Sequence, residues 1–173
     1  YDNNLVRMVA KKLDIREETA RAVDETTLNS FLSGYVLAPM EYAKNAGNIE
    51  TIQPLNEQVY ELQTEIIRKL AYRGPCVIVG RCADYVLKGY ADCIDVFICA
   101  DREDRIRRIA KRYDLSERKA ADRIAKVDRE RRYYYESHTG QEWGSTDTYQ
   151  IVLNASRLGI ERMVDVLEMI YKA

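Results

Sequence analysis

The chain has 173 residues, of which 32% are charged and 46% hydrophobic. That length suits one domain with a sizeable core that needs no disulfides. Its 27 basic and 28 acidic residues nearly cancel, so the whole molecule has no net attraction for nucleic acid or an anionic membrane, and any anion site must be local.

Other broad features favour a reduced, cytoplasmic protein. No apolar run approaches the length of a membrane span, and no signal-peptide pattern opens the chain, which starts at Tyr1 rather than at methionine. The cysteines lie in or beside apolar runs and lack metal-ligand spacing, so buried reduced thiols are favoured over a disulfide or a zinc site. These cysteines are Cys76, Cys82, Cys93 and Cys99.

The first third of the chain reads as helix. Apolar residues from Leu5 to Leu13 recur at helical spacing, and Val23, Leu28 and Leu32 predict a second helical stretch. The segment from Ala38 to Gln53 has little apolar periodicity and contains a glycine, which predicts a mobile connection. Apolar residues from Leu55 to Leu70 then predict one long amphipathic helix that ends near Gly74.

After Pro75 the pattern changes to short continuous apolar runs, typical of strands buried on both faces of a parallel sheet. These runs are Cys76–Val79, Ile94–Cys99 and Tyr149–Leu153. Helical segments separate them, which predicts an α/β fold with binding sites at the carboxyl ends of the strands.

The ends of the first two predicted strands carry arginines. Gly80 allows a tight turn, and Arg81 offers a planar fork of donors to a phosphate or carboxylate. An ion pair between Arg81 and Asp84, or another acid, is an equally open interpretation. Arginines in the helix after Asp101 mostly read as a solvated face.

A strongly cationic segment follows, with seven basic and three acidic residues from Arg118 to Arg132. On a helical wheel, Ala120, Ile124, Val127 and Tyr134 fall on one side, and most cations spread over the other. The pairs Asp122–Lys126 and Asp128–Arg132 have i,i+4 spacing and would each contribute ~0.2 to 0.5 kcal/mol. Such a helix is either a solvated, salt-bridged surface or an anion clamp. The tyrosines from Tyr133 to Tyr135 slightly favour a site.

Taken in order, these motifs resemble the cytidylate kinase-like family of P-loop nucleoside monophosphate kinases. The resemblance covers most of Gly74 to Ala173 and also places Tyr1-Asp2 after a phosphate-loop helix. It is carried by Gly80-Arg81, Ala100-Asp101, Asp128-Arg129, Arg132-Tyr133-Tyr134, Gly140 to Gly144, Tyr149, Ile151 to Asn154 and Leu158 to Glu161. The resemblance implies a three-layer P-loop kinase fold with a parallel sheet, in one domain over residues 1–173. That domain would have a helical substrate-side insertion over residues 14–58 and a helical lid over 116–146.

The resemblance also implies roles for individual residues. Arg81 would hold the phosphate of the acceptor nucleotide, and Asp2, Asp84 and Asp128 would be substrate-binding. Asn154 would begin a loop against the base of the donor. The cations that would close over the donor and acceptor phosphates are Arg123, Lys126, Arg129 and Arg132.

The implied reaction is transfer of the γ-phosphoryl group of ATP, with Mg²⁺, to a nucleoside monophosphate, with CMP or dCMP as first choice. Such a reaction depends on positioning and cationic stabilisation rather than on a general base, so His138 is interpreted as an ordinary surface histidine. The implied partner is a small nucleotide, not nucleic acid or a membrane. The helix from Leu55 to Leu70 could pack against a second copy of the chain in a homodimer. A non-catalytic nucleotide- or polyanion-binding module of kinase ancestry is the alternative.

Two features depart from the family pattern. The sequence has no GxxxxGK[ST] motif, and Tyr149 is followed by Gln150 where the family tends to have Tyr-Asp. In kinases of this fold the phosphate-loop strand is central, and its loss would leave unpaired backbone groups on its neighbours. We therefore expect that the chain is incomplete before Tyr1 and that the structure has an unfilled central slot, a donated strand or a sign of missing residues. A complete five-stranded sheet would contradict this expectation.

Overall fold

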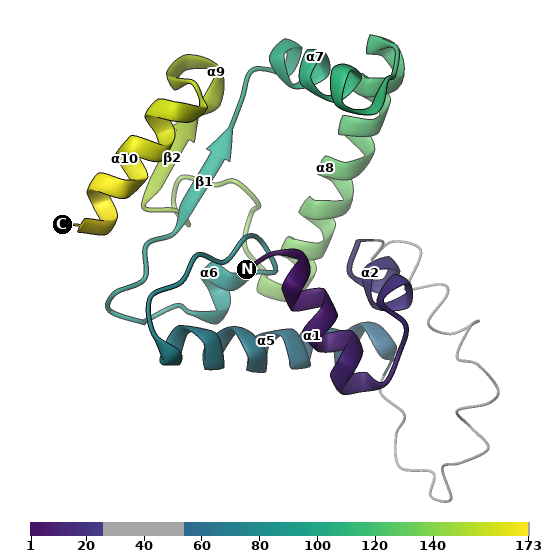
Figure 1. Cartoon of the computed structure of the whole chain (residues 1–173), viewed down its shortest axis with the longest axis vertical. Helices are drawn as coiled ribbons and strands as arrows, with labels where there is room; N and C mark the ends of the chain where they lie inside the picture. Colours follow the sequence, from purple (N-terminus) through teal and green to yellow (C-terminus); the bar gives the residue numbers. More distant parts are fainter. Residues whose placement is uncertain (26–53, 173) are drawn as a thin grey trace, which may run out of the picture. The chain divides into compact units, whose positions relative to one another are not determined.

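The computed structural model describes residues 1–25 and 54–172 (Figure 1). This part of the chain is mostly helical, with one two-stranded parallel sheet. Its elements are α1 (Asn3–Leu13), α2 (Glu17–Glu25), α5 (Leu55–Arg73), α6 (Ala83–Val86), β1 (Val96–Cys99), α7 (Arg102–Tyr113), α8 (Glu117–Thr139), β2 (Ile151–Asn154), α9 (Ala155–Leu158) and α10 (Ile160–Lys172). The α/β class with a parallel sheet is thus confirmed.

The chain divides into two compact units. The first comprises Tyr1–Tyr90 and Tyr133–Gly140, and the second comprises Ala91–Arg132 and Gln141–Ala173. Helix α8 therefore contributes its last residues to the first unit and the rest to the second. Whether the kinase-like domain has an insertion and a lid at the predicted boundaries stays a prediction.

The core of the first unit lies where α1, α2 and α5 pack together. Leu5 and Val9 of α1 are fully buried, as are Ile66 and Ile67 of α5. Their spacing puts them on one face of each helix, and each such side chain contributes roughly 1.5 to 3 kcal/mol when fully buried. The predicted helices at Leu5–Leu13 and Leu55–Leu70 are confirmed. Of the second predicted stretch, Val23 lies in α2, and Leu28 and Leu32 lie outside the described residues, as does the connection from Ala38 to Gln53.

The segment from Cys76 to Val79 is not a regular strand, contrary to the prediction. It runs beside Tyr1, whose carbonyl oxygen accepts a 2.8 Å hydrogen bond from the Val79 amide and whose backbone nitrogen donates to the Val77 carbonyl. Tyr1 alone cannot form a ladder of β-sheet hydrogen bonds with this segment. The valines are 76% (Val77) and 55% (Val79) exposed, so burial on both faces is also wrong for this segment.

The sheet of the second unit joins β1 and β2 in parallel, with Val96 opposite Ile151 and Cys99 opposite Asn154. Figure 1 shows the two strands side by side. They confirm the two later predicted strands to within two residues, but Ile98 and Val152 are exposed, so burial on both faces is wrong for these strands as well. The described residues contain no five-stranded sheet, and the absence of a central strand stays a prediction. Gln150 accepts a 2.6 Å hydrogen bond from the Asp95 amide, which links the starts of the strands.

An aromatic cluster lies on this sheet. The Phe97 ring centroid is 5.6 Å from that of Trp143 and 5.1 Å from that of Tyr149. Gly144 has φ of +81°, and a Cβ atom there would lie 3.0 Å from the Phe97 ring. Because only glycine fits this close approach comfortably, Gly144 lets the segment before β2 lie flat against Phe97.

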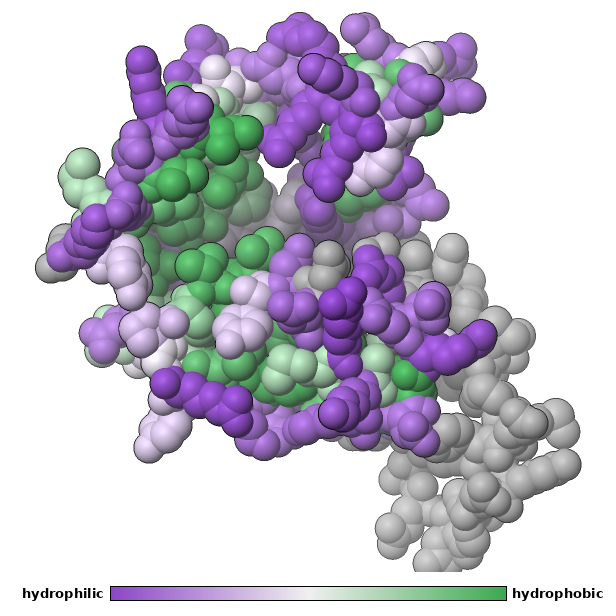
Figure 2. Space-filling view, in the orientation of Figure 1, coloured by the Kyte–Doolittle hydropathy of each residue, from purple (hydrophilic) through white to green (hydrophobic). Residues whose placement is uncertain are grey.

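Several large apolar side chains of the second unit are exposed. Figure 2 shows hydrophobic surface over the part of the molecule that contains β1, β2 and α10. They include Ile98 and Val152 in the sheet and Ile160, Val164 and Met169 in α10. Within the described ranges, no helix combines the length and apolar character required to cross a membrane.

The four cysteines are all free thiols. Cys82 is buried, and Cys93 and Cys99 are partly buried, but Cys76 is exposed. The prediction of buried thiols is therefore wrong for Cys76, because the short pairing with Tyr1 does not enclose that segment.

Candidate functional site

The residues Gly80, Arg81 and Cys82 form a left-handed turn between the Cys76–Val79 segment and α6. Their φ angles are +68°, +62° and +54°. For a residue with a Cβ this conformation costs roughly 1 to 2 kcal/mol, so Arg81 and Cys82 need support from the surrounding structure. Cys82 is buried, and burial raises the pKa of its thiol to about 12. Backbone strain of this kind clusters at active sites and ligand clamps, so the turn makes Arg81 a candidate site residue.

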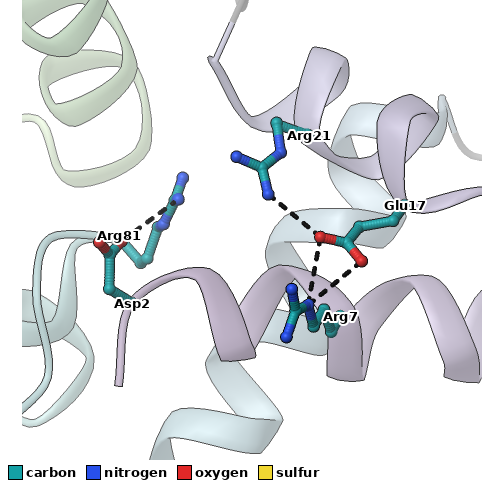
Figure 3. A network of polar contacts seen from close by, with 5 residues as sticks. All are labelled: Asp2, Arg7, Glu17, Arg21 and Arg81. Atoms are coloured by element: carbon teal, nitrogen blue, oxygen red, sulfur yellow. Dashed lines mark hydrogen bonds and ion pairs between the residues drawn. The ribbon is translucent and has the colours of Figure 1, made fainter.

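The turn directs Arg81 toward Asp2 (Figure 3). The Arg81 side chain is only 15% exposed, and its Nη2 atom lies 3.9 Å from Asp2 Oδ1. The sequence left open whether Arg81 pairs with Asp84 or with another acid. The structure shows the second case, with Asp2 as the acid. Arg81 is thus a largely desolvated cation whose pairing with Asp2 is long, and this suits a group that can also receive an anion.

A second charged cluster in the first unit joins α1 and α2. Arg7 and Arg21 converge on the Glu17 carboxylate (Figure 3). Arg7 Nε lies 3.2 Å from Glu17 Oε2, and Arg21 Nη2 lies 3.1 Å from Glu17 Oε1. The bond from Arg21, followed by that from Arg7, lowers the pKa of Glu17. Sequence reasoning missed this cluster, although the i,i+4 spacing of Glu17 and Arg21 was a usable signal.

Asp84 lies in the first turn of α6, close in sequence to Arg81, and binds to α8. The Tyr135 hydroxyl donates a 2.6 Å hydrogen bond to Asp84 Oδ2. The neighbouring Tyr134 hydroxyl donates a 3.0 Å bond to Oε1 of Gln63, which is only 1% exposed. Burial raises the pKa of the Tyr134 phenol. Tyr134 and Tyr135 thus make tertiary hydrogen bonds, and the framing of a site by tyrosines stays a prediction.

His138 is not the ordinary surface histidine that the sequence indicated. Its Nδ1 atom lies 2.8 Å from the Tyr134 carbonyl oxygen, and its ring centroid is 4.1 Å from that of Tyr60 and 4.5 Å from that of Tyr134. The i,i+4 spacing of Tyr134 and His138 brings these rings together on α8. His138 is therefore part of an aromatic cluster with α5.

The predicted lid cations of α8 lie in the second unit, where several have partners. The Arg123 guanidinium lies 4.3 Å from the centre of the Tyr113 ring, and Lys126 is 3.9 Å from Glu130. Ala120 and Ile124 are buried, which confirms the apolar side of the helix. The helix therefore presents its cations away from its packed side, as the wheel predicts.

Asp128 is bound to Arg105 of α7 at 2.7 Å. This bond raises the pKa of the Arg105 guanidinium. The i,i+4 spacing of Asp128 and Arg132 suggested that these two residues pair. The structure instead pairs Asp128 with Arg105, a partner from another helix. Arg129 and Arg132 are both exposed, and Arg129 makes no hydrogen bond or ion pair with any residue in the ranges 1–25 and 54–172.

Asn154 lies where β2 meets α9, at the carboxyl end of the sheet. Its Nδ2 atom donates to Asp101 Oδ1 at 3.1 Å, and its Oδ1 accepts from the Ser156 amide at 2.9 Å. The Asp101 amide in turn donates to Ser156 Oγ at 2.9 Å. A hydrogen bond from Ser156, then one from Arg107, lowers the pKa of Asp104. Asn154 thus caps α9 and ties the ends of both strands together.

The candidate residues fall into two groups. The first unit brings together Asp2, Arg81 and Asp84. The second unit contains Arg123, Lys126, Asp128, Arg129, Arg132 and Asn154. Their assignment as substrate, catalytic or cofactor residues stays a prediction.

Comparison with known proteins gives this arrangement a family. The model of the cytidylate kinase-like family matches residues 1–157, which include every candidate residue. The chain belongs to the cytidylate kinase-like family. A cytidylate kinase from Ignicoccus hospitalis (strain KIN4/I) is 28% identical over 98 residues, and the match covers 57% of this chain and 56% of that protein. This chain thus spans little more than half the length of that curated relative.

A solved structure has a fold similar to that of this cytidylate kinase-like chain. The crystal structure of an uncharacterized protein from Eubacterium ventriosum ATCC 27560 matches with a TM-score of 0.65 and 26% sequence identity. The match covers 69% of this chain and 75% of that chain. The family thus rests on the match to the family model, and the solved structure shows a fold that this chain shares.

Proposed function

We propose that this member of the cytidylate kinase-like family transfers the γ-phosphoryl group of ATP to a nucleoside monophosphate, with CMP or dCMP as the first acceptor to test. The observation that carries the proposal is the strained turn at Gly80–Cys82, which holds Arg81 largely out of solvent beside Asp2. A desolvated guanidinium attracts a phosphate more strongly than an exposed one, and its planar fork can bind two oxygens.

The acceptor side of the site would be formed by the first unit. Arg81 would bind the acceptor phosphate, while Asp2 and Asp84 would accept hydrogen bonds from sugar hydroxyls or base amines. An acceptor phosphate is already anionic near neutral pH and needs little help from a base. The protein's contribution would therefore be positioning and charge stabilisation.

The cations of α8 would act on the transferring group. Arg129 is the strongest candidate, because it is exposed and makes no ion pair with any other described residue. Arg123, Lys126 and Arg132 would add positive charge in a lid over residues 116–146, and residues 14–58 would form the acceptor-side insertion. Closing such a lid excludes water only when substrate is bound.

ATP and Mg²⁺ are the cofactors that this reaction needs. In the described residues no three His, Cys, Asp or Glu side chains are grouped so that they could hold a metal ion. Mg²⁺ in kinases is usually bound through substrate phosphates and only one or two carboxylates, so we propose that it arrives with ATP and stabilises charge on the phosphates. Asn154 would support the loop on the donor side.

An activity panel with ATP, Mg²⁺ and the common nucleoside monophosphates tests the proposal. We expect turnover with at least one acceptor. We expect Arg81→Ala to raise the acceptor KM, lower kcat and reduce kcat/KM by about one to two orders of magnitude, since a bond to a charged group contributes roughly 1.5 to 3 kcal/mol. Arg73→Ala is a matched control, because Arg73 is exposed at the end of α5. Unchanged KM and kcat in Arg81→Ala would refute the phosphate contact.

The same panel separates the alternative function. Nucleotide binding without turnover of any acceptor would favour a non-catalytic nucleotide- or polyanion-binding module of kinase ancestry. Binding that falls in Arg81→Ala would still assign the phosphate contact to Arg81 in that case.

A further inference from the structure

Three consecutive tyrosines in α8 have different environments. Tyr133 is 38% exposed, whereas Tyr135 is only 4% exposed. Tyr134 and Tyr135 place their hydroxyls on different partners in the first unit, Gln63 for Tyr134 and Asp84 for Tyr135. The bond to Gln63 joins two neutral groups inside the helical core, but the bond to Asp84 ends on a carboxylate of the candidate acceptor site. Tyr134 and Tyr135 therefore bind different kinds of partner, a neutral core side chain and a carboxylate of the candidate site.

The bond from Tyr135 to Asp84 has the length of a charge-assisted one. O–H···O⁻ bonds are about 2.5 to 2.7 Å long and roughly twice as strong as bonds between neutral groups. The Tyr135–Asp84 distance is 2.6 Å. Among the residues that the structure describes, Tyr135 is the hydrogen-bond donor to the Asp84 carboxylate. This bond leaves the second carboxylate oxygen, Oδ1, for another donor.

Local structure does little to orient Asp84. Helix α6 has four residues, and its N-cap, Cys82, makes no side-chain capping bond. Asp84 also follows two residues held in the left-handed conformation, Arg81 and Cys82. A short helix after a strained turn needs an external anchor, and a buried tyrosine on a long helix supplies one.

We propose that Tyr135 is a positioning residue for the acceptor, holding the Asp84 carboxylate and, through it, the turn that carries Arg81. This inference rests on the proposed function, since it assigns Asp84 to an acceptor. Tyr135 itself does not contact the acceptor. Its hydroxyl fixes which oxygen of Asp84 is turned to the site and leaves the other oxygen to receive an acceptor amine or hydroxyl.

The test compares Tyr135→Phe with Tyr134→Phe in the full-length protein. Each change removes one phenolic hydroxyl from adjacent positions of the same helix. Tyr135→Phe is expected to raise the acceptor KM about tenfold, the loss equivalent to ~1.4 kcal/mol, with the ATP KM unchanged. Tyr134→Phe is expected to lower the unfolding midpoint and leave the acceptor KM within about twofold.

A double-mutant cycle shows whether Tyr135 acts through Asp84. Adding Tyr135→Phe to Asp84→Asn is expected to raise the acceptor KM no further, because the ionised partner is already gone. If the two substitutions multiply their effects on the acceptor KM in the double variant, the proposal is overturned. An unchanged acceptor KM in Tyr135→Phe would overturn it as well. Equal changes of KM in Tyr135→Phe and Tyr134→Phe would also overturn it, since they would show a merely structural role. A wild-type protein that neither binds nor phosphorylates any acceptor would refute the proposed function as well, whereas an active wild type with a normal Tyr135→Phe variant refutes this inference alone.

Discussion

Replacing Asn154 by aspartate is expected to destabilise the protein in a pH-dependent way. Asn154 uses its amide nitrogen to donate to Asp101 and its amide oxygen to cap α9. Asparagine, aspartate and serine are similar N-caps, so both Asn154→Asp and Asn154→Ser keep the capping acceptor and lose the donor to Asp101. The two variants differ mainly in the new negative charge of Asn154→Asp.

The geometry sets the size of this difference. In Asn154→Asp, a carboxylate oxygen would replace a nitrogen that lies 3.1 Å from Asp101 Oδ1. Two unit charges 4 Å apart interact by about 1 kcal/mol in water and about 4 kcal/mol near a protein surface. The Asp101 side chain is 41% exposed, and Arg157 lies 3.7 Å from it, so we expect a value near the lower limit. Asn154→Asp should thus be less stable than Asn154→Ser by roughly 1 kcal/mol at pH 7.

The difference should disappear at low pH. A like charge raises the folded-state pKa of the introduced carboxyl above its unfolded value of about 3.9. Such a group favours the folded state below the unfolded pKa and loses that contribution as pH rises through the folded pKa. The penalty of Asn154→Asp relative to Asn154→Ser should therefore be full at pH 7, slightly smaller at pH 5, reduced to about a third at pH 4 and nearly absent at pH 3.

Urea unfolding of the wild type and both variants at these pH values measures the effect. Equal stability of Asn154→Asp and Asn154→Ser at pH 7, or a difference that does not change with pH, would refute the assignment of the Asn154–Asp101 bond. The ATP KM of Asn154→Ser, measured in parallel, tests the donor-side role predicted for Asn154, because the cap is retained in that variant.

Two further predictions use matched positions. Gly144→Ala and Gly159→Ala both place a Cβ at positive φ, which costs roughly 1 to 2 kcal/mol of stability. Only the Cβ at position 144 contacts Phe97, so Gly144→Ala should lose a further ~1 to 3 kcal/mol of unfolding free energy, measured in denaturant. Equal losses in the two variants would contradict the close approach of Gly144 to Phe97. In the native protein an aromatic disulfide reagent should react quickly with the exposed Cys76 and only after unfolding with Cys82, whose buried thiol has a pKa of about 12. A fast phase that survives Cys76→Ser and disappears in Cys82→Ser would show that this order is wrong.

Periodicity was a good guide to the helices because each of them buries one face. The spacing of Leu5 and Val9 in α1 and of Ile66 and Leu70 in α5 predicted both helices, and these side chains are buried. The apolar run from Cys76 to Val79 was misleading. A run of this kind shows that a segment can be a buried strand, but whether it becomes one depends on partners that no local pattern reveals.

The candidate site was only partly predictable for a similar reason. The glycine at position 80 predicted a tight turn, yet left-handed conformations at Arg81 and Cys82 have no signal in residue type, because both residues disfavour them. The Tyr135–Asp84 bond joins residues 51 positions apart, and spacing rules cover only neighbours in sequence. The family resemblance supplied the site residues, but their bonding partners came from the tertiary structure.

Asp128 shows how such a tertiary partner bears on function. A pairing inside one helix contributes ~0.2 to 0.5 kcal/mol, whereas a short bond between two charged groups that are partly withdrawn from water contributes more. Arg105 of α7 therefore outcompetes the partner that spacing offered, and it holds Asp128 at 2.7 Å. The bond from Arg105 occupies Oδ1 of Asp128 and leaves its Oδ2 atom for a substrate. This bond fixes α8 against α7 and so holds the neighbouring Arg129 in place for the role proposed for Arg129, while the substrate-binding role of Asp128 stays a prediction.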